Sequence, residues 1–263
     1  MQVVSTRSEL AAARSKLPGR VAVVMTMGAL HDGHVELVKR ARAEADSVVV
    51  TIFLNPLQFA AGEDLDRYPR RLEHDLPLCE TAGADVVFTP LPAEVYPQAP
   101  VVRVSAGALG DVFEGASRAG HFDGVVTVVL KLIHLVRPDV AYFGQKDAQQ
   151  LACIRQMVRD LDVPVQVIAV PTVRDADGLA LSSRNEYLSD EQHRRALVLS
   201  RALATRDLAA GRALIDAEPG VDLDYLERVD SATFEATPDG DLIVVAAKVG
   251  TTRLIDNLLL EDA

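Results

Sequence analysis

The sequence predicts an α/β fold, a parallel sheet with helices on both faces, followed by a smaller α+β domain. Short apolar runs rich in β-branched residues alternate with amphipathic stretches, as in folds whose strands and helices alternate along the chain. The chain has 263 residues, 49% of them hydrophobic, which is enough for one substantial core and a second, smaller domain. The expected strands cover 21–25, 48–54, 85–89, 140–144 and 165–170.

Two helices are best supported by their spacing. Apolar residues recur at helical intervals over 146–161, while glutamine and arginine take the other faces. A second, more apolar helix is expected over about 124–136, because Pro138 would stop it before a strand that begins near Asp139.

The character of the sequence changes after Pro171. A polar loop covers 174–185, and Ser189 is expected to cap a helical segment that ends at Gly211. The rest predicts a small α+β unit, with a strand near 224–229, a turn at 238–240 and an apolar strand at 242–250. We therefore expect one domain over 1–172 and another over 173–263.

Composition argues against two classes of partner. The formal net charge is −11, and no run of Lys or Arg is long enough to follow a nucleic-acid backbone. No signal-peptide pattern opens the chain, and the apolar runs are interrupted well short of a membrane span.

The two cysteines, Cys79 and Cys153, are too sparse for a disulfide framework and are expected to be buried thiols. We expect a cytoplasmic protein.

The first expected strand ends in MTMGALHDGH, residues 25–34, with Gly28 and Gly33 flanking a turn. Such a strand-to-helix turn can direct backbone N–H groups and imidazoles at a nucleotide phosphate. His31 and His34 are therefore candidates for contacting phosphate oxygens as negative charge develops. A capped helix with incidental histidines is one alternative. A zinc pair is another, although no Cys or third His lies at zinc-finger spacing.

Two further segments carry polar side chains beside apolar ones. FLNPLQF, residues 53–59, places Asn55 and Gln58 at the carboxyl end of the second expected strand, where their neutral amides suit a small hydroxy acid. The alternative is a simple turn at Asn-Pro. EGASRAGHFDGV, residues 114–125, contains Arg118 and His121 and is either a mobile flap or a plain surface loop.

YFGQKDAQQL, residues 142–151, leads from a strand through Gly144 into a helix. A lysine at a helix N-terminus opposes the helix dipole unless an anion binds there, so Lys146 is a candidate triphosphate ligand. Asp147 suits the dipole in any case and could be a simple helix-start carboxylate. Gln150, one turn later, could contact a substrate or lie in solvent.

DGLALSSRN, residues 177–185, lies at the expected domain junction. From a hinged loop, Ser182, Ser183 and Arg184 could close two hydroxyls and a guanidinium over phosphates. A polar linker with an N-cap explains the same composition equally well.

Read together and in order, MTMGALHDGH, FLNPLQF, SRAGHFDGVVTVV, FGQKDAQQ and DGLALSSRN resemble the pantothenate synthetase family. The first is similar to the histidine signature of class I adenylyl-transferring enzymes. The resemblance implies a Rossmann-like domain for ATP and pantoate, a C-terminal lid and a homodimer. It also implies the ATP-dependent joining of pantoate to β-alanine through a pantoyl-adenylate, with Mg²⁺ held mainly by the nucleotide phosphates and no protein metal site.

The same resemblance implies roles for individual residues. The expected catalytic residues are His31, His34, Lys146, Ser182, Ser183 and Arg184. The expected ATP contacts are these six together with Met27, Gly28, Gly144, Asp147, Val173 and Leu181. The expected pantoate contacts are Met27, Asn55, Gln58, His121 and Gln150, with Arg118 in the flap-like segment.

Two positions depart from the family pattern. Met25 stands where the family usually has Pro, which frees the backbone torsion and adds an N–H group at the strand end. Gln145 stands where many relatives carry Glu. Two rival functions share parts of the pattern: a nucleotidyltransferase that stops after adenylylating a phosphate monoester, and a nucleotide sensor without catalysis.

Overall fold

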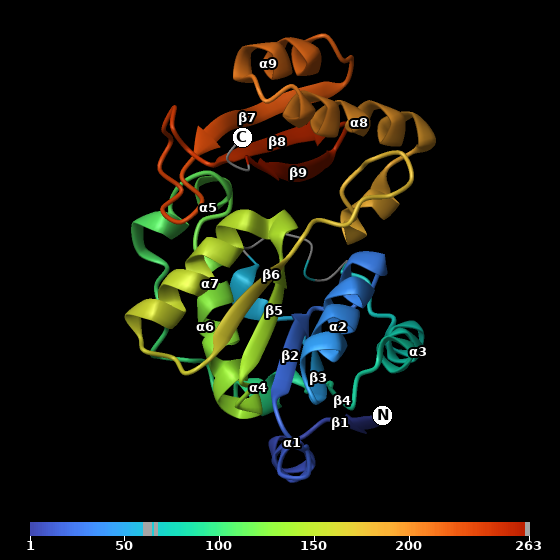
Figure 1. Cartoon of the computed structure of the whole chain (residues 1–263), viewed down its shortest axis with the longest axis vertical. Helices are drawn as coiled ribbons and strands as arrows, with labels where there is room; N and C mark the ends of the chain where they lie inside the picture. Colours follow the sequence, from blue (N-terminus) through green and yellow to red (C-terminus); the bar gives the residue numbers. More distant parts are fainter. Residues whose placement is uncertain (60–64, 66–67, 261–263) are drawn as a thin grey trace. The chain divides into compact units, whose positions relative to one another are not determined.

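The computed structural model describes residues 1–59, 65 and 68–260. Its first unit contains a six-stranded, fully parallel sheet in the order β1-β4-β3-β2-β5-β6 (Figure 1). The strands are β1 (Gln2–Val4), β2 (Val21–Thr26), β3 (Ser47–Ile52), β4 (Val86–Phe88), β5 (Val140–Gly144) and β6 (Gln166–Val170). The predicted fold class is confirmed. Strand β1 was not predicted, because its QVV sequence contains only two apolar residues.

Helices connect these strands and continue into the second unit. The α-helices are α1 (Arg7–Arg14), α2 (Asp32–Glu44), α3 (Leu72–Ala82), α4 (Pro92–Val95), α5 (Glu114–Ser117), α6 (His121–Val136), α7 (Ala148–Asp160), α8 (Asp190–Ala204) and α9 (Leu208–Asp216). Short 3₁₀ helices are η1 (Pro56–Gln58), η3 (Gly107–Gly110), η4 (Gln145–Asp147) and η5 (Ser183–Tyr187).

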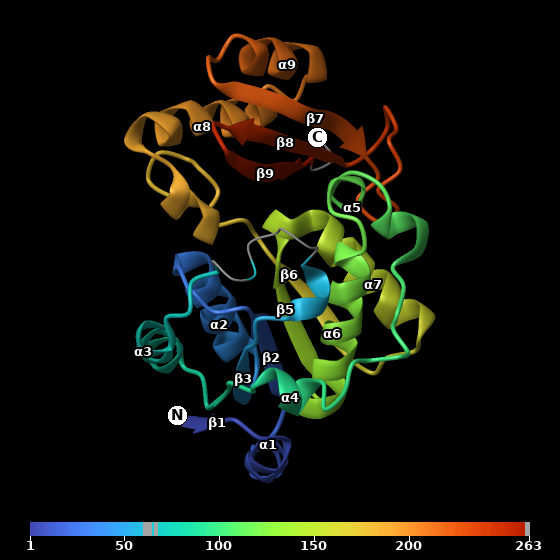
Figure 2. The ribbon, with the colours of Figure 1, turned by 180° about the vertical axis from the view of Figure 1, so that it is seen from behind.

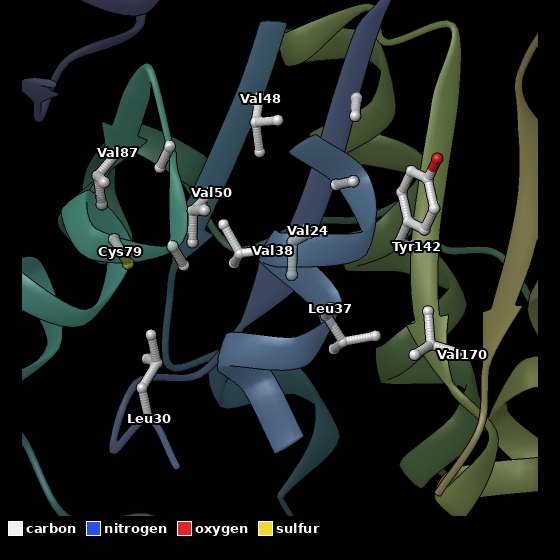
Figure 3. Close-up of a cluster of buried hydrophobic side chains, with 14 of the residues drawn as sticks. Val24, Leu30, Leu37, Val38, Val48, Val50, Cys79, Val87, Tyr142 and Val170 are labelled. Carbon is white, nitrogen blue, oxygen red and sulfur yellow. The ribbon is translucent and has the colours of Figure 1, made fainter. Parts of the chain in front are cut away.

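The parallel sheet is buried on both faces. Figure 3 shows one face, where Leu37 and Val38 of α2 and Cys79 of α3 pack against alternate strand residues such as Val24 and Val50. The intervening strand residues, including Val21, Val23 and Val49, are also buried. Helix α6 covers that second face (Figure 2). Near-continuous Val-rich strands are what a sheet covered on both sides requires.

The second unit is built on an antiparallel sheet with the strand order β7-β8-β9. The strands are β7 (Val221–Val229), β8 (Leu242–Val249) and β9 (Thr252–Leu259). Helices α8 and α9 supply its core through residues such as Leu199, Leu203 and Ile215. This compact unit comprises Gln145–Ala152 and Pro171–Ala263, and the first comprises Met1–Gly144 and Cys153–Val170.

Three predicted elements need correction, and one further strand was missed. The helix expected over 146–161 begins as the 3₁₀ helix η4, and the one expected over 124–136 begins earlier, at His121. The single helix expected to end at Gly211 is two helices, because Arg206 takes a φ of 57° and Asp207 caps α9. Ser189 does cap α8, as predicted. Strand β9 was not predicted at all.

Candidate active site

Three neighbouring strands of the parallel sheet end at one edge. Strand β2 lies between β3 and β5, and the chain runs outward from it in both directions, to β3 and β4 on one side and to β5 and β6 on the other. Ligands of open α/β sheets bind at this kind of reversal, outside the carboxyl ends of the strands. The turn after β2, Asn55 after β3 and Gly144 at the end of β5 are all found here.

The turn after β2 is held by a buried carboxylate. Gly28 has a φ of 88° and Ala29 a φ of 51°, both in the left-handed region that favours glycine. The Asp75 carboxylate on α3 accepts hydrogen bonds from the backbone N–H groups of Ala29 and Leu30, each at 2.9 Å. A Cβ atom on Gly28 would lie 3.2 Å from the Asp75 Oδ2 atom. Asp75 therefore fixes the strained turn that precedes His31.

The two histidines of this turn cap helix α2 with one ring nitrogen each. His31 Nδ1 accepts from the backbone N–H of Gly33 at 3.1 Å, and His34 Nδ1 accepts from the backbone N–H of His31 at 3.3 Å. The ring centroids are 4.1 Å apart. A nitrogen that accepts carries no proton, so both rings are neutral here with their proton on Nε2. The cap thus uses the Nδ1 atom of each ring and not Nε2.

Asn55 is enclosed by protein hydrogen bonds. Its Nδ2 group donates to Gln58 Oε1 at 3.0 Å and to the Gly124 carbonyl at 3.1 Å. Its Oδ1 atom accepts from the Leu57 N–H at 3.3 Å and from the Tyr96 hydroxyl at 3.0 Å. The Tyr96 hydroxyl is a donor here, and burial raises its pKa to about 12, so it stays protonated well above neutral pH. The simple turn at Asn-Pro, which was the alternative to a substrate contact, is also present, because Asn55 caps the 3₁₀ helix η1.

Helix α6 closes on η1 at a glycine. A Cβ atom at Gly124 would lie 2.3 Å from the Leu57 carbonyl oxygen, so no larger residue fits without displacing backbone. His121, at the start of α6, has Nδ1 2.8 Å from the Gln58 carbonyl oxygen, and the Arg118 Nη1 atom lies 2.9 Å from His121 Nε2. Because arginine only donates, His121 must be neutral with its proton on Nδ1.

Gln58 is oriented by these neighbours. Its Oε1 atom accepts from Asn55, and its Nε2 group lies 3.3 Å from the Met27 sulfur. Only 7% of Gln58 and 1% of Asn55 is exposed. The structure thus brings Met27, Asn55, Gln58 and His121, four of the five predicted pantoate contacts, into one hydrogen-bonded cluster. Tyr96 and Asp75 belong to this region but were missed, since a lone tyrosine and a helical aspartate give no sequence signal.

The second unit contains Gln150 and the predicted ATP contacts of η4 and of the loop after Pro171. Lys146 and Asp147 form part of η4, with Lys146 Nζ 3.5 Å from Asp147 Oδ1 and side-chain exposures of 17% and 50%. Gln150, the fifth predicted pantoate contact, is half-buried on the first turn of α7.

The loop after Pro171 forms a small hairpin. The Leu181 N–H donates to the Val173 carbonyl at 2.9 Å, and Arg174 and Ala180 form an isolated bridge. Ser182 follows the hairpin and caps η5, since its Oγ atom accepts from the Arg184 N–H at 3.3 Å. Ser182, Ser183 and Arg184 are all half-buried. The N-cap that the sequence predicted as an alternative is therefore present. The side chains of Ser183 and Arg184 take no part in this cap.

Two kinds of feature are absent from the described residues. Within 1–59, 65 and 68–260, no three His, Cys, Asp or Glu side chains gather closely enough to hold a metal ion. No helix in the same part of the chain is long and apolar enough to cross a membrane.

Comparisons with known proteins agree over nearly the whole chain. Residues 2–259 match the family model described as pantoate-beta-alanine ligase. The chain is 58% identical to pantothenate synthetase 4 of Frankia alni over 95% of this chain and 85% of that protein. It is 54% identical to pantothenate synthetase of Salinispora arenicola over 100% and 98% of the two chains.

Two solved structures are similar to this one along the whole length. Pantothenate synthetase from Thermus thermophilus has a TM-score of 0.94 at 47% identity, covering 100% of both chains. Pantoate-beta-alanine ligase from Francisella tularensis, solved with βγ-ATP and β-alanine, has a TM-score of 0.89 at 34% identity, covering 100% of this chain and 99% of that one.

Proposed function

The chain belongs to the pantoate–β-alanine ligase family, and from this premise we propose how its residues perform the reaction of that family. The reaction is the ATP-dependent condensation of pantoate with β-alanine in pantothenate biosynthesis. The match over residues 2–259 carries this assignment. The Francisella relative, solved with βγ-ATP and β-alanine, supports ATP and β-alanine as substrates.

The condensation is proposed to proceed in two steps. A pantoate carboxylate oxygen attacks the α-phosphorus of ATP, and the bond to pyrophosphate breaks. The amine of β-alanine then attacks the acyl carbon of the pantoyl-adenylate, the bond to AMP breaks, and the amine nitrogen loses a proton to solvent. The protein supplies positioning and donors for the developing phosphate charge, with no covalent enzyme intermediate.

Gln58 is the proposed donor to pantoate. Asn55 fixes the Oε1 end of Gln58, so the Nε2 group is the end that can donate to a carboxylate or hydroxyl oxygen. Asn55 already uses both amide hydrogens and both lone pairs within the protein. Its contact with pantoate therefore requires one of these bonds to open. Met27, His121 and Gln150 remain proposed pantoate contacts.

The phosphates are proposed to receive two kinds of donor. His31 and His34 would donate through Nε2, as neutral hydrogen-bond donors, because their Nδ1 atoms cap α2. Lys146, Ser182, Ser183 and Arg184 would bind the triphosphate with charge and hydroxyl groups. The remaining proposed ATP contacts are Met27, Gly28, Gly144, Asp147, Val173 and Leu181.

Magnesium is proposed to arrive with the nucleotide. Mg²⁺ binds through substrate phosphates and a few oxygen ligands more often than in an all-protein cage, and the described residues offer no cluster of three acidic, His or Cys ligands. The bound Mg²⁺ would neutralise phosphate charge.

A homodimer and a cytoplasmic location also stay predictions, which sedimentation and cell fractionation would test. The division into domains at 172/173 is proposed as well.

Exchange of labelled pyrophosphate into ATP tests the first step. With magnesium and pantoate present and β-alanine absent, we expect exchange that depends on pantoate. Exchange that ignores pantoate but responds to a phosphate monoester would favour the nucleotidyltransferase alternative. Folded, ATP-binding protein without exchange or pantothenate formation would favour the sensor alternative and contradict the proposal.

A further inference from the structure

Strand β9 carries two adjacent buried polar residues that the proposed chemistry does not use. Asp256 and Asn257 are 4% and 5% exposed, although β9 lies at the edge of its sheet (Figure 1). Buried polar side chains are destabilising unless they are hydrogen-bonded. Neighbouring side chains on a strand point to opposite faces, so such a pair can reach two different segments.

Asn257 binds the segment that contains Lys146. Its Nδ2 group donates to the Gln145 carbonyl at 3.0 Å and to the Lys146 carbonyl at 2.9 Å. Both amide hydrogens are thus spent on consecutive carbonyls of η4, more than a hundred residues earlier in the chain. The backbone position from which the Lys146 side chain projects is fixed by Asn257.

Asp256 binds the hairpin that precedes Ser182. Its carboxylate oxygens accept from Arg174 Nη1 at 2.6 Å and from Arg174 Nη2 at 2.9 Å. Arg174 Nη1 also donates to the Gly178 carbonyl at 3.1 Å, across the hairpin. A bidentate pair with a buried carboxylate is strong and fixes orientation as well as distance. Asp256 Oδ1 also accepts from the Asn257 N–H at 2.8 Å, which joins the two contacts.

We propose that Asp256 and Asn257 are positioning residues for the triphosphate: one strand holds both the Lys146 segment and the hairpin that leads to Ser182–Arg184. This rests on the proposed function of Lys146 and the serines. All of these residues lie in the second compact unit. Through these hydrogen bonds β9 sets the spacing of the two segments within the unit.

Asn257→Asp is the sharpest test. The carboxylate has the shape of the amide but cannot donate, so the carbonyls of Gln145 and Lys146 would each lose their donor and face a negative charge. We expect the affinity for a non-hydrolysable ATP analogue, measured by calorimetry with magnesium, to fall about tenfold or more, which is about 1.4 kcal/mol. The affinity for pantoate should stay within about twofold, because four of its five proposed contacts, all except Gln150, lie in the other unit.

Two further variants separate positioning from general damage. Arg174→Lys keeps the charge opposite Asp256 but removes the bidentate geometry, and it should also weaken the ATP analogue selectively. Arg253→Ala is the matched control, because it removes the pair between Arg253 Nη2 and Asp224 Oδ2 at 2.6 Å from the same strand. This control should leave both affinities unchanged.

The outcomes are distinct. Equal losses of ATP-analogue and pantoate affinity in Asn257→Asp, or an ATP-analogue affinity like that of Arg253→Ala, would overturn the proposal. If Asn257→Asp does not fold, Arg174→Lys decides by the same criterion. Lys146→Ala is the reference for the function itself. If Lys146→Ala keeps its affinity for the analogue, the proposed role of Lys146 is wrong. If it loses affinity while Asn257→Asp does not, only the positioning proposal fails.

Discussion

The proposed pantoate residues and the proposed triphosphate residues differ in how the rest of the protein holds them. Asn55, Gln58 and His121 are buried, and close neighbours occupy their polar atoms. Lys146, Ser183 and Arg184 are half-buried in the 3₁₀ helices η4 and η5, and a distant strand sets the backbone of Lys146. The first group is thus built before a ligand arrives. The second includes the cationic side chains of Lys146 and Arg184, whose charge suits the polyanionic end of the nucleotide.

The largest effect is expected from substitutions of His31. The same ring caps helix α2 through Nδ1 and is proposed to donate to a phosphate through Nε2. His31→Asn keeps an acceptor near the Nδ1 position and loses the Nε2 donor, whereas His31→Gln does the reverse. We expect His31→Asn to fold normally and to lose about 10²–10³-fold in pyrophosphate exchange, with His31→Gln retaining more. Equal activity in His31→Asn and the parent enzyme would contradict the proposed phosphate contact of Nε2.

Gly124→Ala tests whether the pantoate cluster is rigid. Alanine would favour the helix by roughly 1 kcal/mol, but its Cβ atom would meet the Leu57 carbonyl oxygen at 2.3 Å. Backbone must move, so we expect a net loss of about 1–3 kcal/mol in the free energy of unfolding and weaker pantoate binding. Urea denaturation and calorimetry measure both. Parent-like stability would show that α6 can shift away from η1 without cost.

Tyr96→Phe is a smaller change in the same cluster. It removes the hydroxyl that donates to Asn55 Oδ1 at 3.0 Å, which should lower the free energy of unfolding by about 1 kcal/mol and raise the KM for pantoate up to about fivefold. The KM for ATP should not change. Tyr225→Phe in the C-terminal sheet is the control, and an equal pantoate effect there would contradict the local interpretation.

The smallest expected effect concerns the thiols. Burial raises the pKa of Cys79 and of Cys153 from 9.0 to about 12. An acid with a raised folded pKa stabilises the protein fully below its unfolded pKa, and this contribution is lost as pH rises from about 9 toward 12. We expect unfolding free energy to fall over that range and both thiols to resist alkylation at pH 8 while folded. Rapid alkylation of native protein at pH 8 would contradict this burial.

Much of the fold follows from local patterns. Val-rich runs such as 48–52 predict buried parallel strands because both faces of that sheet are covered. The division of the helix expected to end at Gly211 was not predictable, because the left-handed Arg206 carries no turn signature. Strand β9 was missed since its TRLIDNLL sequence places Asp256 and Asn257 where apolar residues would be expected. Those two residues are tolerated there only through partners far along the chain.

The sequence by itself determined the class of fold, the family and the chemical types at the proposed site, because these depend on periodicity and on side chains close together in the chain. Tertiary structure decided which polar atoms of each side chain are already hydrogen-bonded within the protein. Neighbours supplied by folding determine the orientation of the site residues, including Asp75 for the turn before His31, Tyr96 for Asn55 and Asn257 for Lys146. A hydrogen bond depends on distances of about 3 Å, and contacts between residues far apart in sequence reach that distance only after folding.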